Sequence, residues 1–261
     1  MENPTFIHKQ RYPSPHSEIK LYIVTYLSQG LRVKGLLAEP TWGGRYPGLL
    51  YLRGGIKQVG KVRVARIIQF ASRGFVVLAP YYRGNEDGEG HEDFCMEDRY
   101  DAYEGLAVLG SHSVVDTDSL HVFGFSRGGA MALFTAAHFP DIVKSVVVWG
   151  GLSDMKLTYE ERTDLRKMLK RAVGGSVYKY PERYENRTPL SVVGSIRAPV
   201  LVIHGIHDEN VGFEHALRLE EALKRHEKSY VTWYFEDDHH FSPRKKRQVT
   251  HELLKWMLRN V

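Results

Sequence analysis

The sequence predicts an α/β protein whose core is a mostly parallel, doubly wound β-sheet. Short apolar runs rich in Val, Leu and Ile recur along the chain, as is typical of parallel strands that are covered on both faces. Amphipathic stretches with apolar residues at helical spacing separate these runs. This alternation predicts strands joined by right-handed helical crossovers, with ligands bound at the carboxyl ends of the strands.

The expected elements begin with a β-hairpin. Its two β-rich runs, residues 19–25 and 31–38, flank the turn Ser28-Gln29-Gly30. Parallel strands are then expected at residues 48–52, 74–79, 120–125, 143–149, 199–204 and 230–235. Helices are expected at residues 96–107, 130–137, 216–223 and 249–256. A length of 261 residues suits one large domain, so a single domain over residues 1–261 is expected.

Residues 152–197 interrupt the alternation and are expected to form a small helical insertion over the sheet. Two interpretations stay open: the insertion is structural filler, or it is a lid that shapes a substrate pocket. In the second case its aromatic residues, with Trp149 and Tyr82 near strand ends, would wall a pocket for short acyl or aromatic groups. The aromatic residues concerned are Tyr159, Tyr178, Tyr180 and Tyr184.

Composition and charge argue against a nucleic-acid partner. The formal net charge is +5, and the chain is 43% hydrophobic and 26% charged, as is ordinary for a globular protein. Basic residues cluster at 166–171 and 244–247, in stretches expected to be helical, and no aromatic residues interleave them. Solvated helix faces are the simpler interpretation of both clusters, so no nucleic-acid partner is expected.

Cysteine content and the first residues bear on location. Cys95 is the only cysteine, so no intrachain disulfide can form, which fits a reducing compartment. Residues 1–20 carry prolines and charges and lack the apolar core of a signal peptide. No apolar run reaches the roughly 18 residues of a transmembrane helix, so no membrane association is expected. A cytoplasmic location is therefore expected.

The densest chemical signal is Gly124-Phe125-Ser126-Arg127-Gly128-Gly129, between an expected strand and an expected helix. This is the G-x-S-x-G pattern in a strand–turn–helix context. Such a sharp turn strains the serine backbone and leaves no room for side chains two residues before and after it. The turn would lift the Ser126 hydroxyl out of the sheet and aim the Arg127 N–H at a developing oxyanion. The alternative is a glycine-rich turn with an inert serine.

A nucleophilic serine of this kind needs an acid and then a histidine further along the chain. The acid candidate is Asp208, in the loop after the expected strand 199–204, because the Gly205 turn would direct it back toward the strand ends. Its role would be to hold the histidine tautomer and to stabilise the imidazolium. Asp208 and its neighbour Glu209 can each also be an exposed loop charge.

Two adjacent histidines, His239 and His240, follow the expected strand 230–235. Only one of them can reach Ser126, and from the residues alone either qualifies. With Asp237 and Asp238 they also suggest a metal site, but nothing nearby completes a ligand set of the usual spacing. No metal and no organic cofactor is therefore expected.

Further blocks of sequence carry a family pattern. They are Gly-Phe-Val-Val-Leu-Ala-Pro-Tyr-Tyr-Arg-Gly at 74–84, Asp-Arg-Tyr-Asp-Ala at 98–102, Arg-Thr-Pro-Leu at 187–190 and Pro-Val-Leu-Val-Ile-His-Gly at 199–205. Over residues 45–261 the chain resembles the catalytic domain of the prolyl oligopeptidase family. The resemblance implies an α/β-hydrolase fold, here with an N-terminal β-hairpin and a small helical insertion.

The same resemblance implies a role for each candidate residue. Ser126 is the nucleophile and Asp208 the acid. His239 is the base, because the family's histidine stands two residues before a Phe, here Phe241. His240 stands where the family usually has Gly.

The segment Arg53-Gly54-Gly55-Ile56 resembles the family's His-Gly-Gly-Pro oxyanion loop. Without a Cβ, the N–H groups of Gly54 and Gly55 can approach a tetrahedral intermediate closely, and with the Arg127 N–H they would form the oxyanion hole. Arg53 replaces the family's His and either pairs with a substrate carboxylate or makes a structural ion pair. Tyr82 is the second candidate substrate-binding residue.

These observations predict a serine hydrolase that cleaves a small-molecule ester or short peptide through an acyl-enzyme. The best-known peptidases of the family carry a β-propeller before the catalytic domain, and residues 1–45 are too few to form one. A carboxylesterase that acts on short-chain acyl esters therefore stays open. So does a non-catalytic binding protein on a hydrolase scaffold. The sequence does not determine the oligomeric state.

Overall fold

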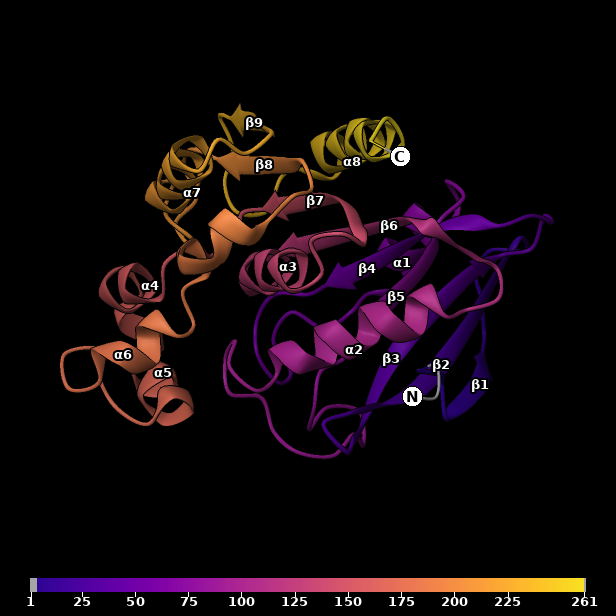
Figure 1. Ribbon diagram of the computed structural model, residues 1–261, viewed down its shortest axis with the longest axis horizontal. Coiled ribbons are helices and arrows are strands. Elements are labelled where there is room, and N and C mark those ends of the chain that lie inside the picture. The colour runs from indigo at the N-terminus through magenta and orange to yellow at the C-terminus, as the bar shows by residue number, and fades with distance from the viewer. Residues whose placement is uncertain (1–3, 261) are drawn as a thin grey trace.

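A computed structural model describes residues 4–260 and places a nine-stranded sheet at the centre of this part of the chain (Figure 1). The strand order is β1-β2-β3-β5-β4-β6-β7-β8-β9. The pairs β1–β2, β2–β3 and β3–β5 are antiparallel, and every pair from β5–β4 to β8–β9 is parallel. The strands are β1 (His8–Tyr12), β2 (Ile19–Ser28), β3 (Leu31–Pro40), β4 (Tyr46–Leu52), β5 (Val76–Pro80), β6 (Val115–Phe125), β7 (Val143–Trp149), β8 (Val200–Gly205) and β9 (Tyr230–Phe235).

The predicted hairpin is confirmed as β2 and β3, and its turn explains the register. Ser28 pairs with Leu31, so Gln29 and Gly30 alone form the connection. Both have positive φ, 49° and 80°, as a type I′ turn requires. Gly30 adopts this backbone at no steric cost, and the turn's twist matches that of the strands.

The predicted parallel strands are confirmed, and those inside the sheet are buried on both faces, whereas the edge strand β9 is partly exposed. Along β4, Leu50 and Leu52 belong to the core on one face of the sheet, while Leu49 and Tyr51 belong to the core on the other. Successive side chains of a strand point to opposite faces, so a strand covered on both sides must be apolar throughout.

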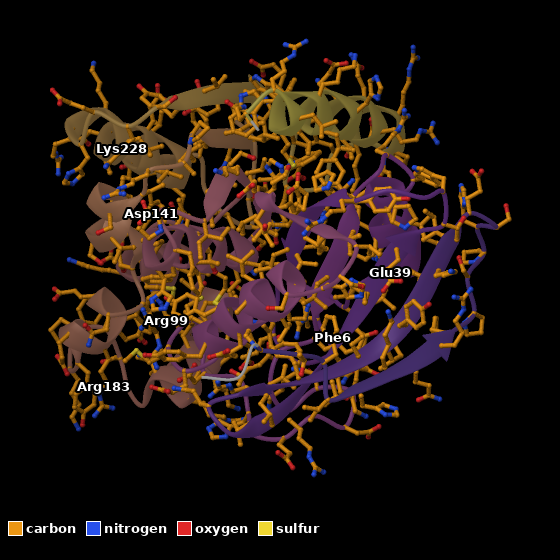
Figure 2. The ribbon with its side chains drawn as sticks, turned by 45° about the vertical axis from the view of Figure 1, so that its right-hand side comes forward. Phe6, Glu39, Arg99, Asp141, Arg183 and Lys228 are labelled. Atoms are coloured by element: carbon orange, nitrogen blue, oxygen red, sulfur yellow. The ribbon has the colours of Figure 1, made fainter. Side chains whose placement is uncertain are left out.

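Helices cover each face of the sheet. On one face lie α2 (Arg99–Gly110), α3 (Arg127–His138) and α7 (Glu214–Arg225), whose apolar residues join the first core. On the other face lie α1 (Val64–Ala71) and α8 (Pro243–Leu258). Charged side chains such as those of Asp141, Arg183 and Lys228 lie at the periphery (Figure 2). Within residues 4–260 no helix is both long and apolar enough to cross a bilayer.

The insertion consists of short helical segments grouped on the side of the sheet opposite β1 (Figure 1). They are α4 (Met155–Glu161), the 3-10 turn η1 (Thr163–Leu165), α5 (Arg166–Val173), α6 (Pro181–Glu185) and the 3-10 turn η2 (Pro189–Ser195). The expectation that the insertion's aromatic residues and Trp149 wall a pocket is wrong for Tyr159, Tyr184 and Trp149, which are buried in the core. The rings of Tyr159 and Tyr184 pack 5.5 Å apart, because the insertion needs an apolar interior of its own.

Two elements have no counterpart among the sequence-based expectations. All residues of β1 are exposed, so its sequence lacks the alternation that marks a half-buried strand, and it is held by pairing with β2. The helix α1 is short, and it packs Ile67 and Phe70 against the sheet.

Candidate active site

Ser126 occupies the sharp turn between β6 and α3, with φ 56° and ψ −125°. A non-glycine residue with positive φ is strained, and such strain persists only where the surrounding structure imposes it. A Cβ on Gly124 would lie 2.1 Å from the Gly128 carbonyl oxygen, and a Cβ on Gly128 would lie 2.0 Å from the Leu52 carbonyl oxygen. Both positions of the nucleophile turn, residues 124–128, therefore require glycine.

The turn is held by main-chain hydrogen bonds from β7 and the loop that follows it. The Ser126 N–H donates to the Trp149 carbonyl at 3.1 Å. The Ser126 carbonyl accepts from the N–H groups of Gly129 at 2.8 Å and Leu152 at 3.1 Å. The strained serine is thus fixed by segments on both sides of it.

Asp208 lies in the loop after β8, and its buried carboxylate is oriented by three contacts. Its Oδ1 accepts from the N–H groups of Asn210 at 2.9 Å and Val211 at 2.8 Å. Its Oδ2 lies 2.7 Å from His239 Nδ1. The adjacent Glu209 is exposed. A carboxylate only accepts hydrogen bonds, so this contact places a proton on His239 Nδ1 and leaves Nε2 as an acceptor.

The two neighbouring histidines lie in different environments. His239 is buried and contacts Asp208, whereas His240 is exposed. Partial burial, the neighbouring His239 and Lys246 lower the pKa of His240. The Phe125 ring lies 4.7 Å from the His239 ring and 5.5 Å from the His240 ring, which brings both histidines beside the residue that precedes Ser126.

Gly150 lets the segment after β7 pass close to the Asp208–His239 pair. Its φ is 52°, and a Cβ there would lie 3.2 Å from His239 Nδ1 and 3.3 Å from Asp208 Oδ2. Among the hydrogen bonds of residues 4–260, none joins Ser126 Oγ to His239. Hydrogen bonds of this kind often tighten only in the substrate complex.

Residues 53–60, which include the predicted oxyanion segment 53–56 and are called the oxyanion loop after that expectation, lie directly against Ser126. A Cβ on Gly54 would lie 2.6 Å from Ser126 Cβ and 3.2 Å from its Oγ. Gly55 has φ 66°, and a Cβ there would lie 2.4 Å from the Val59 carbonyl oxygen. Arg127 is the first residue of α3, so its N–H has no partner within the helix. The structure thus brings Gly54 close to Ser126, and Arg127 follows Ser126 directly at the start of α3.

Arg53 and Tyr82 are buried, which does not fit the substrate-binding role expected for them. Arg53 Nη2 lies 3.0 Å from Glu92 Oε1, and its Nη1 donates to the Gly54 carbonyl at 3.0 Å. Of the two roles left open for Arg53, the structure contains the ion pair. The Tyr82 hydroxyl donates to the Arg53 carbonyl at 3.3 Å, and its ring packs under the guanidinium groups of Arg53 and Arg127.

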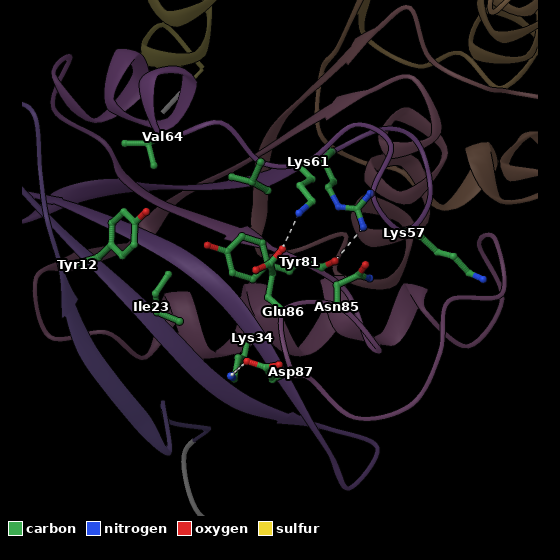
Figure 3. A pocket seen from close by; sticks show the side chains of 12 residues that line it. Tyr12, Ile23, Lys34, Lys57, Lys61, Val64, Tyr81, Asn85, Glu86 and Asp87 are labelled. Atoms are coloured by element: carbon green, nitrogen blue, oxygen red, sulfur yellow. Dashed lines mark hydrogen bonds and ion pairs between the residues drawn. The ribbon is translucent and has the colours of Figure 1, made fainter.

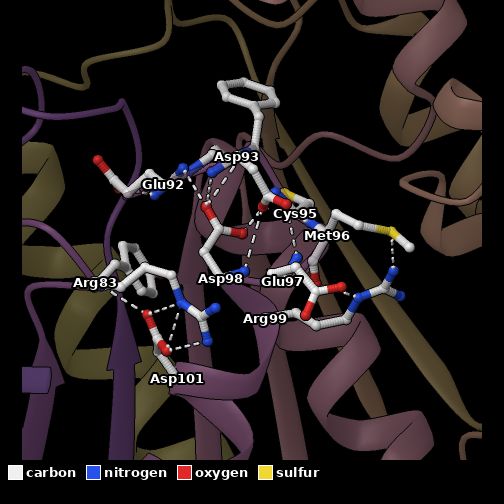
Figure 4. A network of polar contacts seen from close by, with 12 residues as sticks. Arg83, Glu92, Asp93, Cys95, Met96, Glu97, Asp98, Arg99 and Asp101 are labelled. Atoms are coloured by element: carbon white, nitrogen blue, oxygen red, sulfur yellow. Dashed lines mark hydrogen bonds and ion pairs between the residues drawn. The ribbon is translucent and has the colours of Figure 1, made fainter. Parts of the chain in front are cut away.

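A buried ion-pair network lies behind the nucleophile turn, and Figure 4 shows its acidic part. The Arg127 side chain pairs with Glu92 at 2.5 Å and with Asp98 at 3.1 Å. Burial raises the pKa of Asp98 to about 6, against the effect of Arg127. Burial also tends to raise the pKa of Glu92, but Arg127 and Arg53 bring it below its ordinary value. Sequence reasoning missed these partners, since acidic residues crowd positions 86–101 and only the fold selects among them.

A cavity of about 360 Å³ borders the oxyanion loop (Figure 3). Lys57 and Tyr81 line it, and so do the surface ion pairs Lys61–Glu86 at 3.2 Å and Lys34–Asp87 at 3.5 Å. Ser126, Asp208 and His239 do not line this cavity. It is therefore separate from the candidate active site.

Comparisons with solved structures define the class of protein. An acylaminoacyl peptidase from Pyrococcus horikoshii superposes with a TM-score of 0.78 at 17% identity, over 100% of this chain and 50% of that chain. Acetyl xylan esterase 1 from Thermoanaerobacterium sp. superposes with a TM-score of 0.76 at 18% identity, over 97% of this chain and 88% of that chain. The fold is therefore that of the α/β hydrolases.

Sequence comparisons then define the family. Residues 61–261 match the model of the prolyl oligopeptidase family. An uncharacterized peptidase of Bacillus subtilis (strain 168), YtmA, is 54% identical over 252 residues, which cover 96% of this chain and 98% of the relative. The chain belongs to the prolyl oligopeptidase family, as its sequence blocks predict.

Proposed function

We propose that the protein is a serine hydrolase in which Ser126 is the nucleophile, His239 the general base and Asp208 the acid. One observation carries the proposal. A strained serine, fixed between two positions that admit only glycine, lies at the strand ends where a buried carboxylate orients a histidine through a 2.7 Å contact. A structural turn has no need of this strain or of the buried Asp–His pair.

Each residue has a defined role in the proposed reaction. His239 Nε2 removes the Ser126 hydroxyl proton as Oγ attacks the carbonyl carbon of an ester or amide. The tetrahedral oxyanion accepts hydrogen bonds from the Arg127 N–H and from the Gly54 or Gly55 N–H. His239 then protonates the leaving group, and the C–O or C–N bond breaks to give an acyl-enzyme. In the second half-reaction His239 activates water, which releases the acid and restores Ser126.

Small esters and short peptides are the substrates that the relatives support best. The Bacillus subtilis relative that is 54% identical to this chain is named a peptidase. The acylaminoacyl peptidase and the acetyl xylan esterase share the fold. Hydrolysis of short-chain acyl esters alone is the second candidate. It is supported by the fold shared with the acetyl xylan esterase.

We infer that the insertion, residues 152–197, forms one wall of the substrate site. Arg162 donates to the Asn210 carbonyl at 2.9 Å, and Glu161 accepts from the Gly212 N–H at 3.3 Å, so the insertion contacts the loop that carries Asp208. Arg187 donates to the Asp93 carbonyl at 3.2 Å, next to the Glu92 network. These contacts place the insertion beside both the acid loop and the segment that supports the nucleophile turn.

The test is hydrolysis of a substrate panel by the parent protein and by Ser126→Ala. The panel contains p-nitrophenyl esters of rising chain length and aminoacyl and dipeptidyl anilides. Loss of the serine is expected to lower kcat by roughly 10⁶-fold without unfolding the protein, since alanine fits the turn. Cleavage of esters and not anilides would select the esterase candidate. Substantial activity in Ser126→Ala would overturn the proposal.

A further inference from the structure

We propose that Glu92 is a positioning residue that fixes the oxyanion loop against the nucleophile turn. The inference rests on the function proposed above and assigns a role to a residue that the reaction itself does not use. Glu92 contacts neither Ser126 nor His239 in the described structure. Its effect on the reaction is exerted through the segments that supply the oxyanion hole.

The carboxylate of Glu92 contacts both sides of the oxyanion hole. Its Oε1 lies 3.0 Å from Arg53 Nη2 and 2.5 Å from Arg127 Nη2. Its Oε2 accepts the Lys57 N–H at 2.5 Å. Arg53 directly precedes Gly54, Lys57 follows Gly55 by two residues, and Arg127 carries the other proposed donor N–H. One carboxylate thus joins the loop at two points to the first residue of α3.

Burial makes these contacts strong constraints. The side chains are 1% exposed for Glu92, 3% for Arg53 and 1% for Arg127. Burial lowers the pKa of Arg53, the neighbouring Arg127 lowers it further, and Glu92 opposes both effects. Without Glu92, the two buried guanidinium groups, which pack on the same Tyr82 ring, would repel each other. Removal of one partner of a buried ion pair leaves an uncompensated charge, which drives local rearrangement.

Apart from Glu92, the oxyanion loop is held mainly through Arg53, whose Nη1 donates to the Gly54 and Val59 carbonyls at 3.0 and 3.2 Å, and by the Val59 N–H, which donates to the Ile56 carbonyl at 3.0 Å. Gly55, Lys57 and Gly60 have positive φ, of 66°, 54° and 71°. Two of these are glycines, which allow many other conformations, and the third is strained. An oxyanion donor is effective only when it points at the position of the developing charge to within a few tenths of an ångström. Glu92 holds both the Arg53 guanidinium and the Lys57 N–H, so it anchors this loop from outside.

Glu92 itself lies on a rigid support. Phe94 and Cys95 adopt φ of 64° and 73°, and their N–H groups donate to the Asp98 carboxylate at 3.1 and 2.7 Å. Asp98 also pairs with Arg127. The segment that carries Glu92 is thus tied to the same arginine as Glu92, so the carboxylate cannot follow the loop if the loop moves.

The experiment compares Glu92→Gln with Asp101→Asn. Asp101 is also fully buried and pairs with Arg83 at 2.8 Å (Figure 4). Among the hydrogen bonds and ion pairs of residues 4–260, none links Asp101 to the oxyanion loop or to Arg127. The Asp101→Asn variant therefore measures how an impaired buried ion pair affects the protein when the oxyanion loop is not involved. The measurements are kcat and KM for p-nitrophenyl acetate, inhibition by phenylboronic acid as a tetrahedral mimic, and hydrogen exchange of the peptide that contains residues 54–60.

For Glu92→Gln we expect kcat to fall about 100-fold, KM to change less than about threefold, and phenylboronic acid to bind about 100-fold more weakly, as for loss of an oxyanion donor. The 54–60 peptide should exchange faster than in the parent. Asp101→Asn should be destabilised, with kcat and loop exchange close to those of the parent. Equal kcat losses in the two variants, or unchanged loop exchange in Glu92→Gln, would overturn the proposal.

A second variant covers the case in which Glu92→Gln does not fold. Arg53→Lys keeps the positive charge but loses the fork that reaches Glu92 and the Gly54 carbonyl together, and it should give the same pattern with a smaller kcat loss. The parent protein could also hydrolyse no substrate while the loop still exchanges faster in either variant. These results would support the anchoring role and overturn the hydrolase proposal instead. If the loop exchanges faster while kcat stays at the parent value, the anchoring has no effect on catalysis. That result would overturn the proposed positioning role.

Discussion

At the scale of single residues, the adjacent His239 and His240 differ in burial and in hydrogen bonding. The imidazole of His239 is buried and held by Asp208, while that of His240 is exposed beside Phe125. The family resemblance implies that His239 is the base, and the geometry gives the same preference for a physical reason. Only a histidine with an oriented Nδ1–H presents its Nε2 in a fixed direction.

Replacement of each histidine by alanine should therefore give unequal effects. His239→Ala is expected to lower kcat by roughly 10⁶-fold, as for other triad histidines. His240→Ala should keep kcat within about tenfold of the parent, since it removes only a neighbour of the base. Steady-state hydrolysis of p-nitrophenyl acetate measures both. Equal losses would contradict the assignment of His239.

At the scale of elements, the oxyanion loop and the nucleophile turn fit together with no spare space. The loop's Gly54 meets Ser126 so closely that a methyl group cannot be added without displacement. The two segments come from β4 and β6, which are neighbours in the sheet. Adjacent parallel strands thus bring Ser126 and the proposed oxyanion donors to the same edge of the sheet.

Gly54→Ala should test this fit. The added Cβ would lie 2.6 Å from Ser126 Cβ, so the loop must shift and misalign its N–H groups. We expect kcat to fall about 10²- to 10³-fold, with the melting temperature little changed. Gly43→Ala is the matched control, because nothing lies within 4 Å of the position that its added methyl group would take, and its φ is not in the left-handed region. Parent-like activity in Gly54→Ala would contradict the proposed oxyanion hole.

A second prediction at this scale concerns His121 in the middle of β6. Burial lowers its pKa to about 4, and Lys144 contributes. A histidine whose pKa is depressed in the folded state stabilises the fold above pH 6.5 and loses this contribution as the pH falls toward 4. The free energy of unfolding should therefore fall with decreasing pH, with His121 contributing about 1.4 kcal/mol per pH unit.

Urea unfolding between about pH 7 and pH 4.5 measures this slope. His121→Gln removes the titrating group, so the slope should decrease by about 1.4 kcal/mol per pH unit. The variant is expected to be less stable at neutral pH, because glutamine cannot keep both contacts to Ser119 at 3.2 Å and Ser145 at 2.8 Å. An unchanged slope would show that His121 is not the group responsible.

At the scale of the whole molecule, periodicity predicted the hairpin, the parallel strands and most of the helices. It missed β1, because an exposed edge strand leaves no apolar pattern, and α1, which is short. Ser126 and Asp208 could be proposed from sequence because their order and strand-end positions follow from the fold, and the family resemblance implies His239 rather than His240. Glu92 could not, since its partners are 35 and 39 residues away and nothing local marks it.

The central claim is that Ser126 is an activated nucleophile, and covalent labelling tests it most directly. The intact protein is treated with a fluorophosphonate, digested, and the labelled peptide is sequenced by mass spectrometry. We expect one adduct, on Ser126, with labelling lost in Ser126→Ala and strongly slowed in His239→Ala. A folded parent protein that stays unlabelled, or an adduct on a different residue, would contradict the account.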